Sequence, residues 1–468
     1  MSRNTVTRAK VGLLVTALLE DRWNKTGHMR PKAQEVTDHL AGVVGRYADV
    51  VNPGFVENED DAHRAAQLFN AEDVGLIVFV EIAYQKGMIP LRTLLNTHAP
   101  ILVWNTQMID EFPDGADFDL IMFNSGMAGL SEVTGALTRC GRSFSMLTGY
   151  LEDPQMLGEL EDFIQAAKTR QNLRNARIGI IGHPYEGMAD HMVDQLSLRN
   201  RIGPVVWPIE HDEVAQMAAQ VSEERLKNLV ANETQRYGQV GGAPKEVEYS
   251  FRTAIALEEV AKQFDLDALG ILEQIWLEDE RIGLIPSYGN SRLTELGVPC
   301  TCEADVIQAT SMLMLQNLAG HVTFLENYTM DFRKNTMFLS HEGVGNPLLA
   351  DDAQNVELIP SIYYTGVNGC GLSFKFAYRP GNFTIVSLIP LVGDAWRLVV
   401  SEGEAVPTLA RDITSPQMMF RSDRWAVEEF AQRWCMAGPS HHIVGAYGRW
   451  GESLRKLGEM MDIEFVFV

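Results

Sequence analysis

The chain has 468 residues, of which 46% are hydrophobic and 22% are charged, and its formal net charge is −23. This composition is typical of a globular protein. The acidic excess argues against nucleic acid as a partner, because phosphate binding requires a basic surface. No apolar run approaches the ~20 residues of a membrane-spanning helix, so we expect no membrane association.

The cysteine content and the N-terminal segment indicate a cytoplasmic protein. Five cysteines in so long a chain are sparse and odd in number, which fits a reducing compartment better than a disulfide framework. The apolar run at 11–19 is followed by charged residues and lacks a small-residue cleavage site, so we expect a buried strand rather than an export leader.

Residues 1–175 alternate apolar runs with polar segments of helical periodicity. Expected strands are 11–18, 48–54, 74–81, 99–107 and 117–126, and expected helices are 31–48, 60–72, 90–98 and 130–141. Continuous apolar strands separated by helices are typical of a parallel sheet covered on both faces. Ligands usually bind at the carboxyl ends of the strands in such sheets.

The same alternation starts again after a charged helix at 158–175. Strands are expected at 176–184, 203–210 and 268–274, and helices at 187–200 and 246–264. We therefore expect a second α/β domain over 176–320.

From residue 321 onward, strand-like runs are separated by Gly, Pro and Asn turns. These runs are 321–332, 336–342, 372–391 and 396–406, before a helix at 448–461 and a strand at 463–468. The predicted fold is thus α/β, with two doubly wound (Rossmann-like) parallel-sheet domains, 1–175 and 176–320, and an antiparallel β-rich domain, 321–468, of sandwich or barrel type.

Common catalytic motifs are absent from the sequence. It contains no phosphate-binding G-x-x-x-x-G-K-[ST] loop, no G-x-G-x-x-G after a strand and no H-E-x-x-H helix. The segment around Ser125 lacks the first Gly of a nucleophile elbow. These absences remove the commonest kinase, dehydrogenase and hydrolase interpretations.

Acids and imidazoles interrupt otherwise apolar segments at a few places. Glu303 precedes a predicted helix, Glu326 lies within a predicted strand, His341 ends another, and His441 and His442 follow a Gly-Pro turn. Two carboxylates and two imidazoles suit an octahedral divalent cation, and this mixed set favours Mn²⁺, with Mg²⁺ or Co²⁺ as substitutes. Taken singly, each has a simpler explanation, such as a helix-dipole contact for Glu303 or a surface turn for the histidines.

Several motifs resemble those of L-arabinose isomerases. FLENYT at 324–329, SHEGVGNP at 340–347 and PSHHIVG at 439–445 are similar to segments of that family, as are IPSYGNSRLTELGVPCTCEAD at 285–305 and the closing LGEMMDIEFVFV. WNTQ at 104–107 and the Asn124 segment also have counterparts. The resemblance covers nearly the full length and is dense at 285–347 and from 438 onward.

The resemblance implies a fold, a site and a reaction. Glu303, Glu326, His341 and His442 would ligate a divalent metal, and His441 would line the substrate pocket. The family has two doubly wound domains and a barrel-like C-terminal domain, assembled as trimers or hexamers. The implied reaction is aldose–ketose isomerisation through an enediolate, with Glu303 and Glu326 as the acid/base pair.

The chain also departs from the family near the substrate. The family's Gly-Ser-Gln-His stretch corresponds to residues 18–22 here, which include Arg22; a pocket histidine is replaced by Ala128; and Glu342 follows His341 where an apolar residue is usual. His183 is added at an expected sheet edge. Arg22, His183 and Glu342 are therefore candidate substrate contacts, and the sugar need not be L-arabinose.

Two other functions remain open on the sequence. An epimerase or another enediolate-forming lyase would use the same metal ligands, and a non-catalytic sugar-binding protein would keep only the α/β lobes. The complete set of two glutamates and two histidines argues against the non-catalytic alternative, because buried ionisable groups are costly to maintain without a use.

Overall fold

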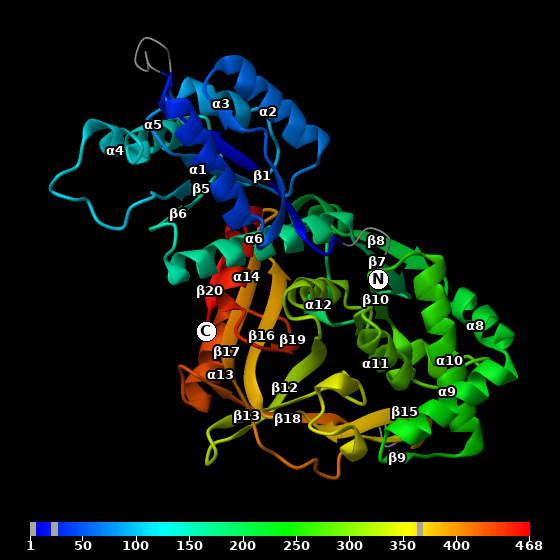
Figure 1. Ribbon diagram of the computed structural model, residues 1–468. Coiled ribbons are helices and arrows are strands. Elements are labelled where there is room, and N and C mark those ends of the chain that lie inside the picture. The colour runs from blue at the N-terminus through cyan, green and yellow to red at the C-terminus, as the bar shows by residue number, and fades with distance from the viewer. Residues whose placement is uncertain (1–5, 20–26, 363–367) are drawn as a thin grey trace. The chain divides into compact units, whose positions relative to one another are not determined.

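The computed structural model describes residues 6–19, 27–362 and 368–468 (Figure 1). The described residues form two compact units, an N-terminal unit that ends at Gln171 and a C-terminal unit that begins at Asn172. The protein is mixed α/β, with one parallel sheet in each unit and a large mixed sheet in the C-terminal unit. The finer division into three domains stays a prediction.

The N-terminal unit is built on a parallel sheet of strand order β2-β1-β4-β5-β6, with β3 pairing beside the end of β1. Its strands are rich in Val, Ile and Leu, and β1 and β4 are buried almost throughout, as expected for strands covered on both faces. The strands are β1 (Ala9–Thr16), β2 (Ala48–Val51), β3 (Phe55–Val56), β4 (Leu76–Glu81), β5 (Ile101–Asn105) and β6 (Ser145–Thr148).

Helices α2 (Glu59–Ala71), α3 (Met88–Leu94) and α5 (Gly126–Arg139) pack through apolar residues onto one face of this sheet. Helix α2 begins where Asn58 accepts a hydrogen bond from the backbone of Asp61, which satisfies one of the free N–H groups at the helix start. The unit also contains α1 (Met29–Val44) and most of α6 (Pro154–Asn175). The residues of α6 from Asn172 onward belong to the C-terminal unit.

The strand predicted at 117–126 is wrong. Residues Phe118–Met122 form the short helix α4, in which no residue is buried, and the Asp117 side chain accepts a hydrogen bond from Leu120 N–H at its start. The apolar residues of α4 do not reach the core, although Phe123 directly after it does, so local capping decides the conformation of α4. The fifth parallel strand is instead β6, where Ser145 to Thr148 pair with Leu102 to Asn105.

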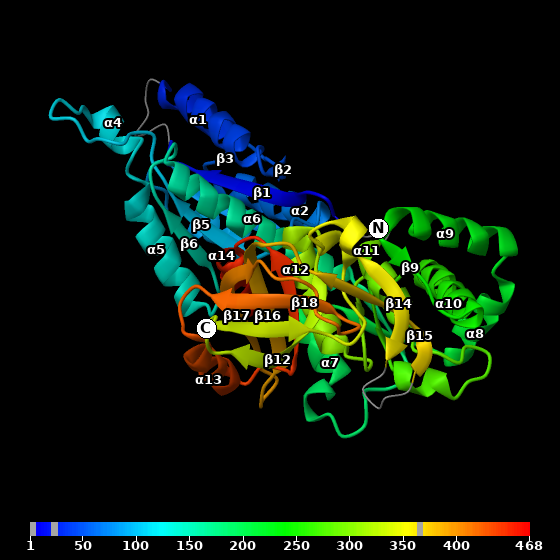
Figure 2. The same cartoon turned by 90° about the horizontal axis from the view of Figure 1, so that it is seen from below.

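The C-terminal unit begins with a second parallel sheet of order β11-β10-β7-β8. Its strands are β7 (Arg177–Ile181), β8 (Val205–Ile209), β10 (Ala268–Ile271) and β11 (Cys300–Thr301). Its helices include α8 (His211–Gln220), α9 (Glu223–Arg236), α10 (Pro244–Gln263) and α11 (Ser287–Glu295). Figure 2 shows α8, α9 and α10 together beside β14 and β15.

The helix predicted at 187–200 is wrong as a continuous element. The structure has a 3-10 turn at Ala189–His191, a single α turn (α7, Gln195–Ser197) and a π turn at Leu198–Ile202. Asp194 accepts hydrogen bonds from Leu196 and Ser197 N–H and so starts a new turn after the first. His191 is fully buried. Tertiary contacts of this histidine, described below, override the helical periodicity.

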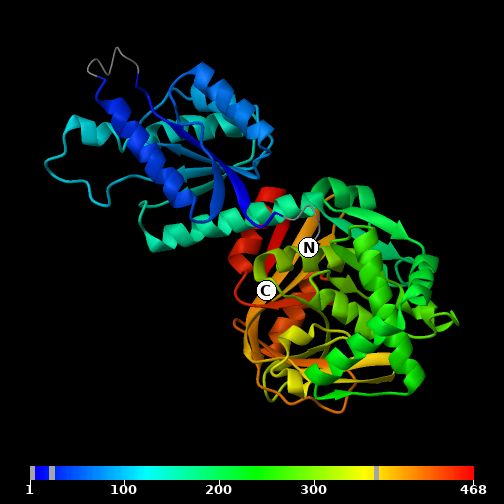
Figure 3. The ribbon, with the colours of Figure 1, turned by 45° about the vertical axis from the view of Figure 1, so that its right-hand side comes forward.

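The large mixed sheet contains a closed succession of strands. β17, β16, β19, β12, β13 and β18 pair in that order, and β18 pairs again with β17. These six strands are β12 (Thr323–Asp331), β13 (Thr336–Ser340), β16 (Gly381–Pro390), β17 (Trp396–Val406), β18 (Pro416–Ser422) and β19 (His442–Tyr447). Figure 3 shows these strands, coloured yellow-green to red, gathered in one region.

Four further strands extend the sheet. They are β9 (Gln239–Val240), β14 (Glu357–Ile362), β15 (Asn368–Ala377) and β20 (Glu464–Phe467). The β9–β14, β15–β18 and β17–β20 pairs are parallel, so the expected purely antiparallel module is a mixed sheet. Each parallel pair joins strands with other elements between them in the chain, because a short hairpin can connect only antiparallel strands.

Three helices accompany this sheet. Helix α12 (Val306–Ala319) is largely buried and packs against β16 and β19. Helices α13 (Val427–Ala437) and α14 (Gly451–Met461) lie beside other strands of the sheet, α13 at β12 and β18 and α14 at β17 and β20 (Figure 1). Neither β18 nor α13 is among the predicted elements. Among the described residues, no helix combines the length and apolar character needed to cross a membrane.

Candidate metal centre

Strand register places three of the predicted ligands side by side. Glu326 in β12 lies opposite Ser340 of β13 on one side and opposite His442 of β19 on the other. His341 follows Ser340 directly, so it leaves the sheet next to the same position. Neighbouring strands lie about 5 Å apart. The antiparallel pairing therefore gathers Glu326, His341 and His442 from segments far apart in the sequence.

Glu303 reaches the same place from the end of the parallel sheet. It follows β11 in a loop where Glu303 and Ala304 have φ of 58° and 55°, a left-handed conformation that is uncommon for residues other than glycine. The Glu303 N–H donates to Oε2 of buried Glu273 at 2.8 Å, which helps to fix this turn. Such local strain is typical of functional sites.

Glu303 is therefore not the first residue of a helix. Helix α12 begins at Val306, and its N-cap is Asp305, whose Oδ1 accepts the Gln308 N–H at 2.9 Å. The helix-dipole explanation consequently applies to Asp305, and the Glu303 side chain is available for the cluster.

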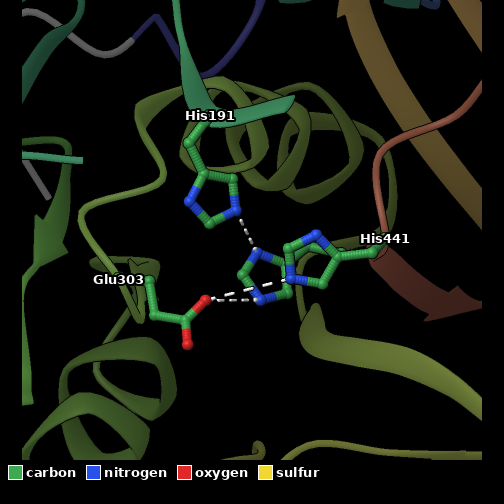
Figure 4. A group of neighbouring side chains, drawn as sticks. His191, Glu303 and His441 are labelled. Atoms are coloured by element: carbon green, nitrogen blue, oxygen red, sulfur yellow. Dashed lines mark hydrogen bonds and ion pairs between the residues drawn. The ribbon is translucent and has the colours of Figure 1, made fainter. Parts of the chain in front are cut away.

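The two carboxylates converge on two adjacent imidazoles. His442 Nε2 lies 3.4 Å from Glu303 Oε2 and 3.6 Å from Glu326 Oε1. His441 Nε2 lies 3.6 Å from Glu326 Oε1 and 3.9 Å from Glu303 Oε2. Figure 4 shows the Glu303 carboxylate pointing toward His441, with His191 above them. The groupings His191–Glu303–His441–His442 and Glu326–His341–His442 each place potential ligand atoms within 4.8 Å of one another.

Several of these ligand atoms have no hydrogen-bond partner in the described part of the chain. Glu303 Oε2, His341 Nδ1 and His442 Nε2 are buried and unsatisfied. A buried polar atom without a partner costs about 1–3 kcal/mol. A divalent cation would satisfy these atoms together, so the residues present fit a metal ion.

Burial and charge set the protonation of the cluster. Burial, followed by the nearby Glu326, raises the pKa of Glu303 to about 7. Burial alone would also raise the pKa of Glu326, but His341 and His442 outweigh it and lower that pKa. Burial lowers the pKa of His341 and holds that of His442 well below its usual value. Neutral imidazoles are the form that binds metal.

A cavity of about 420 Å³ opens beside this cluster. Its lining includes three of the predicted ligands, Glu303, Glu326 and His341, and the predicted substrate contact Glu342. The remaining wall is largely polar: Glu273, Gln274, Tyr328, Ser287, Ser361 and Ser415, with Ile285 and Ile413. The lining residues contain several carboxyl and hydroxyl groups and no lysine or arginine, which suits a neutral, hydroxyl-rich ligand better than an anion.

The other predicted substrate contacts have different outcomes. His441 contacts Glu303 and Glu326 but does not belong to the cavity lining, and its side chain is 38% exposed. His183 is exposed, and its Nδ1 lies 3.0 Å from the Pro184 carbonyl, outside the cluster. The His183 loop nevertheless reaches the site, because Tyr185 N–H donates to the Glu303 carbonyl at 3.2 Å. Arg22 lies outside the described residues.

The sequence interpretation missed four acidic and imidazole groups at this site. Asp190 and His191 lie in the segment predicted as a helix. Glu273 lies in the strand predicted at 268–274, and Asp305 lies directly before helix α12. His442 Nδ1 is 2.9 Å from Asp305 Oδ2 and 3.1 Å from His191 Nε2. The only sequence signal was their position after strands β7, β10 and β11, at the carboxyl edge of the parallel sheet.

Comparison with known proteins agrees with this architecture. Residues 321–464 match the family described as the L-arabinose isomerase C-terminal domain. The chain is 26% identical over 417 residues to L-arabinose isomerase 1 of Bacillus licheniformis, covering 85% of this chain and 81% of that protein. It is 24% identical over 429 residues to the L-arabinose isomerase of Geobacillus stearothermophilus, covering 88% and 85%.

A third relative extends the match. The L-arabinose isomerase of Serratia proteamaculans is 21% identical over 463 residues, covering 94% of this chain and 90% of that protein. The fold and the site define an α/β protein with a carboxylate–imidazole cluster beside a polar cavity. Residues 321–464 thus match the L-arabinose isomerase C-terminal domain, and the chain as a whole is a divergent relative of L-arabinose isomerases, similar to them over most of its length.

Proposed function

We propose that the protein is a metal-dependent sugar isomerase that interconverts an aldose and a ketose. The observation that carries this proposal is the convergence of Glu303, Glu326, His341 and His442, with buried unsatisfied ligand atoms, at the wall of a polar cavity. The relatives are named L-arabinose isomerases, which supports the same class of reaction for this chain.

The four residues would hold a divalent cation, and their mixed oxygen and nitrogen set favours Mn²⁺, with Mg²⁺ or Co²⁺ as substitutes. When bound, such a cation supplies Lewis-acid stabilisation of the negative charge that develops on the sugar oxygens. Two carboxylates without this counter-charge repel each other, which is one reason why the pKa of Glu303 is raised to about 7.

The carboxylates also provide the proton transfer that isomerisation requires. The reaction moves a hydrogen between C1 and C2 of the sugar and protons between its two oxygens. Glu303 and Glu326 both line the cavity, so one carboxylate can remove the carbon-bound proton while the other acts on an oxygen-bound proton. The enediolate formed in this way leads back to the aldose or on to the ketose.

The polar wall around the cluster would select the sugar. The side chains of Glu342, Gln274, Ser361 and Ser415 line the cavity together with the two glutamates. A buried polar group that loses its partner hydroxyl costs about 1–3 kcal/mol, which is enough to change substrate preference. We therefore propose a pentose, hexose or modified sugar as substrate, not necessarily L-arabinose.

We extend the proposal to a cytoplasmic homo-oligomer, a trimer or a hexamer. The family resemblance and the composition support this extension, and light scattering of the purified protein tests the subunit number directly.

An exchange experiment tests the proposed function. The protein is treated with EDTA, reloaded with Mn²⁺ and incubated with a panel of aldoses and ketoses in D₂O, and NMR follows deuterium at C2. Metal-dependent exchange with ketose formation is expected. Exchange that yields only a C2 epimer would favour an epimerase on the same site, and no exchange with any sugar would contradict the proposal.

A matched pair of variants tests the assignment of the site. Glu303→Gln should bind Mn²⁺ more weakly than wild type, whereas Glu280→Gln, on an exposed loop of the same unit, should bind it equally well. Equal Mn²⁺ affinity of both variants would contradict the assignment of Glu303 as a ligand.

A further inference from the structure

Each of the two adjacent histidines at the start of β19 has an aspartate carboxylate within hydrogen-bond distance of its Nδ1 atom. His442 Nδ1 lies 2.9 Å from Asp305 Oδ2, and His441 Nδ1 lies 2.7 Å from Asp190 Oδ2. Both Nε2 atoms then face the Glu303 and Glu326 carboxylates. Asp305 caps helix α12 as well, so it has a structural use of its own. Asp190, by contrast, is not the N-cap of the turn in which it lies.

All the hydrogen bonds that the structure shows for Asp190 go to Ser440 and His441. Besides the imidazole, its Oδ2 accepts the His441 N–H at 2.9 Å and the Ser440 hydroxyl at 2.8 Å. The Ser440 oxygen in turn accepts the His442 N–H at 3.2 Å. Burial alone would raise the pKa of Asp190, but these hydrogen bonds outweigh it and hold the pKa well below its usual range.

The next residue fixes the turn that carries Asp190. His191 is fully buried, its Nε2 lies 3.1 Å from His442 Nδ1, and its ring stacks on those of His441 and His442 with centroids 5.1 Å and 4.9 Å away. Figure 4 shows this ring between its ribbon and the histidine pair. In the 3-10 turn Ala189–His191, the buried His191 side chain thus fixes the backbone, and the Asp190 side chain lies against His441.

An ionised carboxylate can only accept hydrogen bonds, so Nδ1 of His441 carries the proton of this contact. Burial would lower the pKa of His441, but Asp190 and the two nearby glutamates outweigh it and raise that pKa, so the neutral ring, protonated on Nδ1, is the form present above this pKa. Nε2 then presents a lone pair toward the two glutamates. His441 is 38% exposed, so packing alone does not prevent this ring from turning or from taking the other tautomer. A carboxylate behind a functional imidazole is the usual means of fixing both.

We propose that Asp190 is a positioning residue that fixes the tautomer and orientation of His441 at the Glu303–Glu326 pair. The proposal rests on the proposed function, because it assigns to His441 a role beside the sugar. It adds a residue from the β7 loop to a centre whose other groups come from β10, β11 and the mixed sheet.

The first test reads the imidazole directly. In protein labelled with ¹⁵N-histidine and free of paramagnetic metal, NMR of the ring nitrogens should show an Nδ1-protonated ring that disappears in His441→Gln, which assigns the signal. In Asp190→Ala this signal should shift to an Nε2-protonated or mixed form. An unchanged Nδ1-protonated signal in Asp190→Ala would overturn the proposal, whatever the enzyme's activity.

The second test separates positioning from metal binding. For whichever sugar the wild type converts, Asp190→Ala should lower kcat/KM by about 10- to 100-fold, the range typical of lost carboxylate–histidine support. Asp190→Asn keeps an acceptor oxygen, so it should recover part of this loss. The Mn²⁺ affinity should stay within about threefold of wild type, because the imidazole that Asp190 contacts is His441, which is not one of the four proposed ligands.

Asp194→Asn is the matched control. Asp194 lies on the same segment, caps α7 and makes no contact with the histidines, and asparagine also caps helices well. This variant should match wild type in all three measurements. Equal losses of kcat/KM in Asp194→Asn and Asp190→Asn would overturn the proposal in favour of a general effect of charge or loop stability. If no sugar is converted, the proposed function fails, while the NMR result still decides the role of Asp190.

Discussion

Two buried glutamates, one in each unit, show what makes a carboxylate part of a site. Glu81 ends β4 in the N-terminal unit, is 1% exposed, and has a pKa raised to about 8 by burial. Glu303 in the C-terminal unit has a pKa raised to about 7, again chiefly by burial. The two groups are electrostatically alike, and a perturbed pKa by itself would mark both as functional.

Their neighbours differ. Glu81 Oε1 accepts the Gln85 N–H at 2.8 Å, and the charge of another acid, Glu132, raises its pKa further. Glu303 lies against His441 and His442 and close to Glu326. A neutral, protonated glutamate suits the first environment, whereas the second offers several ligand atoms to one cation. Convergence of different ligand types, more than burial, distinguishes the site.

The largest expected difference between the two glutamates is catalytic. Glu326→Gln or Glu303→Gln should lower kcat by about 10²–10⁴-fold, the usual contribution of a general acid or base. Glu81→Gln should retain most of the activity, because glutamine replaces a protonated carboxyl of the same shape. Steady-state kinetics on the sugar identified by deuterium exchange measures both. A comparable loss in Glu81→Gln would break the distinction.

Metal binding should stabilise the protein only through the C-terminal cluster. At a free Mn²⁺ concentration of 100 times Kd, the expected gain in unfolding free energy is about 2.7 kcal/mol. EDTA should remove this gain, and His442→Gln should abolish it, whereas Glu81→Gln should show the full shift. Thermal unfolding with and without metal measures the effect; a shift that survives in His442→Gln would place the ion elsewhere.

Glycines of α5 pack directly against Glu81. A Cβ at Gly129 would clash with Glu81 Oε1, so Gly129→Ala should destabilise the protein by about 1–3 kcal/mol through overpacking. In the same helix a Cβ at exposed Gly135 meets nothing within 4 Å, so Gly135→Ala should stabilise by about 0.5–1 kcal/mol. Chemical denaturation of both variants compares them; equal effects would contradict this packing argument.

The protonation of Glu81 should appear in the pH dependence of stability. A carboxyl with a raised pKa binds its proton more tightly in the folded state, so its stabilisation is complete below pH ~4.3 and is lost as pH rises through about 8. Glu81→Gln should therefore reduce the fall in unfolding free energy across this window, by at most about 1.4 kcal/mol per pH unit. Denaturation of metal-free protein at pH 5 to 9 measures it, and identical slopes would show Glu81 to be ionised.

Hydrophobic periodicity was sufficient to predict most regular elements. The apolar runs of β1, β4, β7 and β10 and the amphipathic α2 and α10 lie where the sequence places them, because these segments bury the faces that their periods indicate. It failed at α4, whose apolar residues stay at the surface, and at 187–200, where buried His191 takes the chain out of a helix.

The candidate site divides in the same way. The sequence by itself determined the types of candidate ligand, two glutamates and two histidines within recognisable motifs, and the strand-like runs that contain or adjoin Glu326, His341 and His442. Only the tertiary structure decided that Asp190 and His191 lie behind His441 and His442, about 250 residues away in the chain. Strand periodicity is a local property of the chain, whereas side-chain hydrogen bonds between distant segments depend on how the sheets pair and pack.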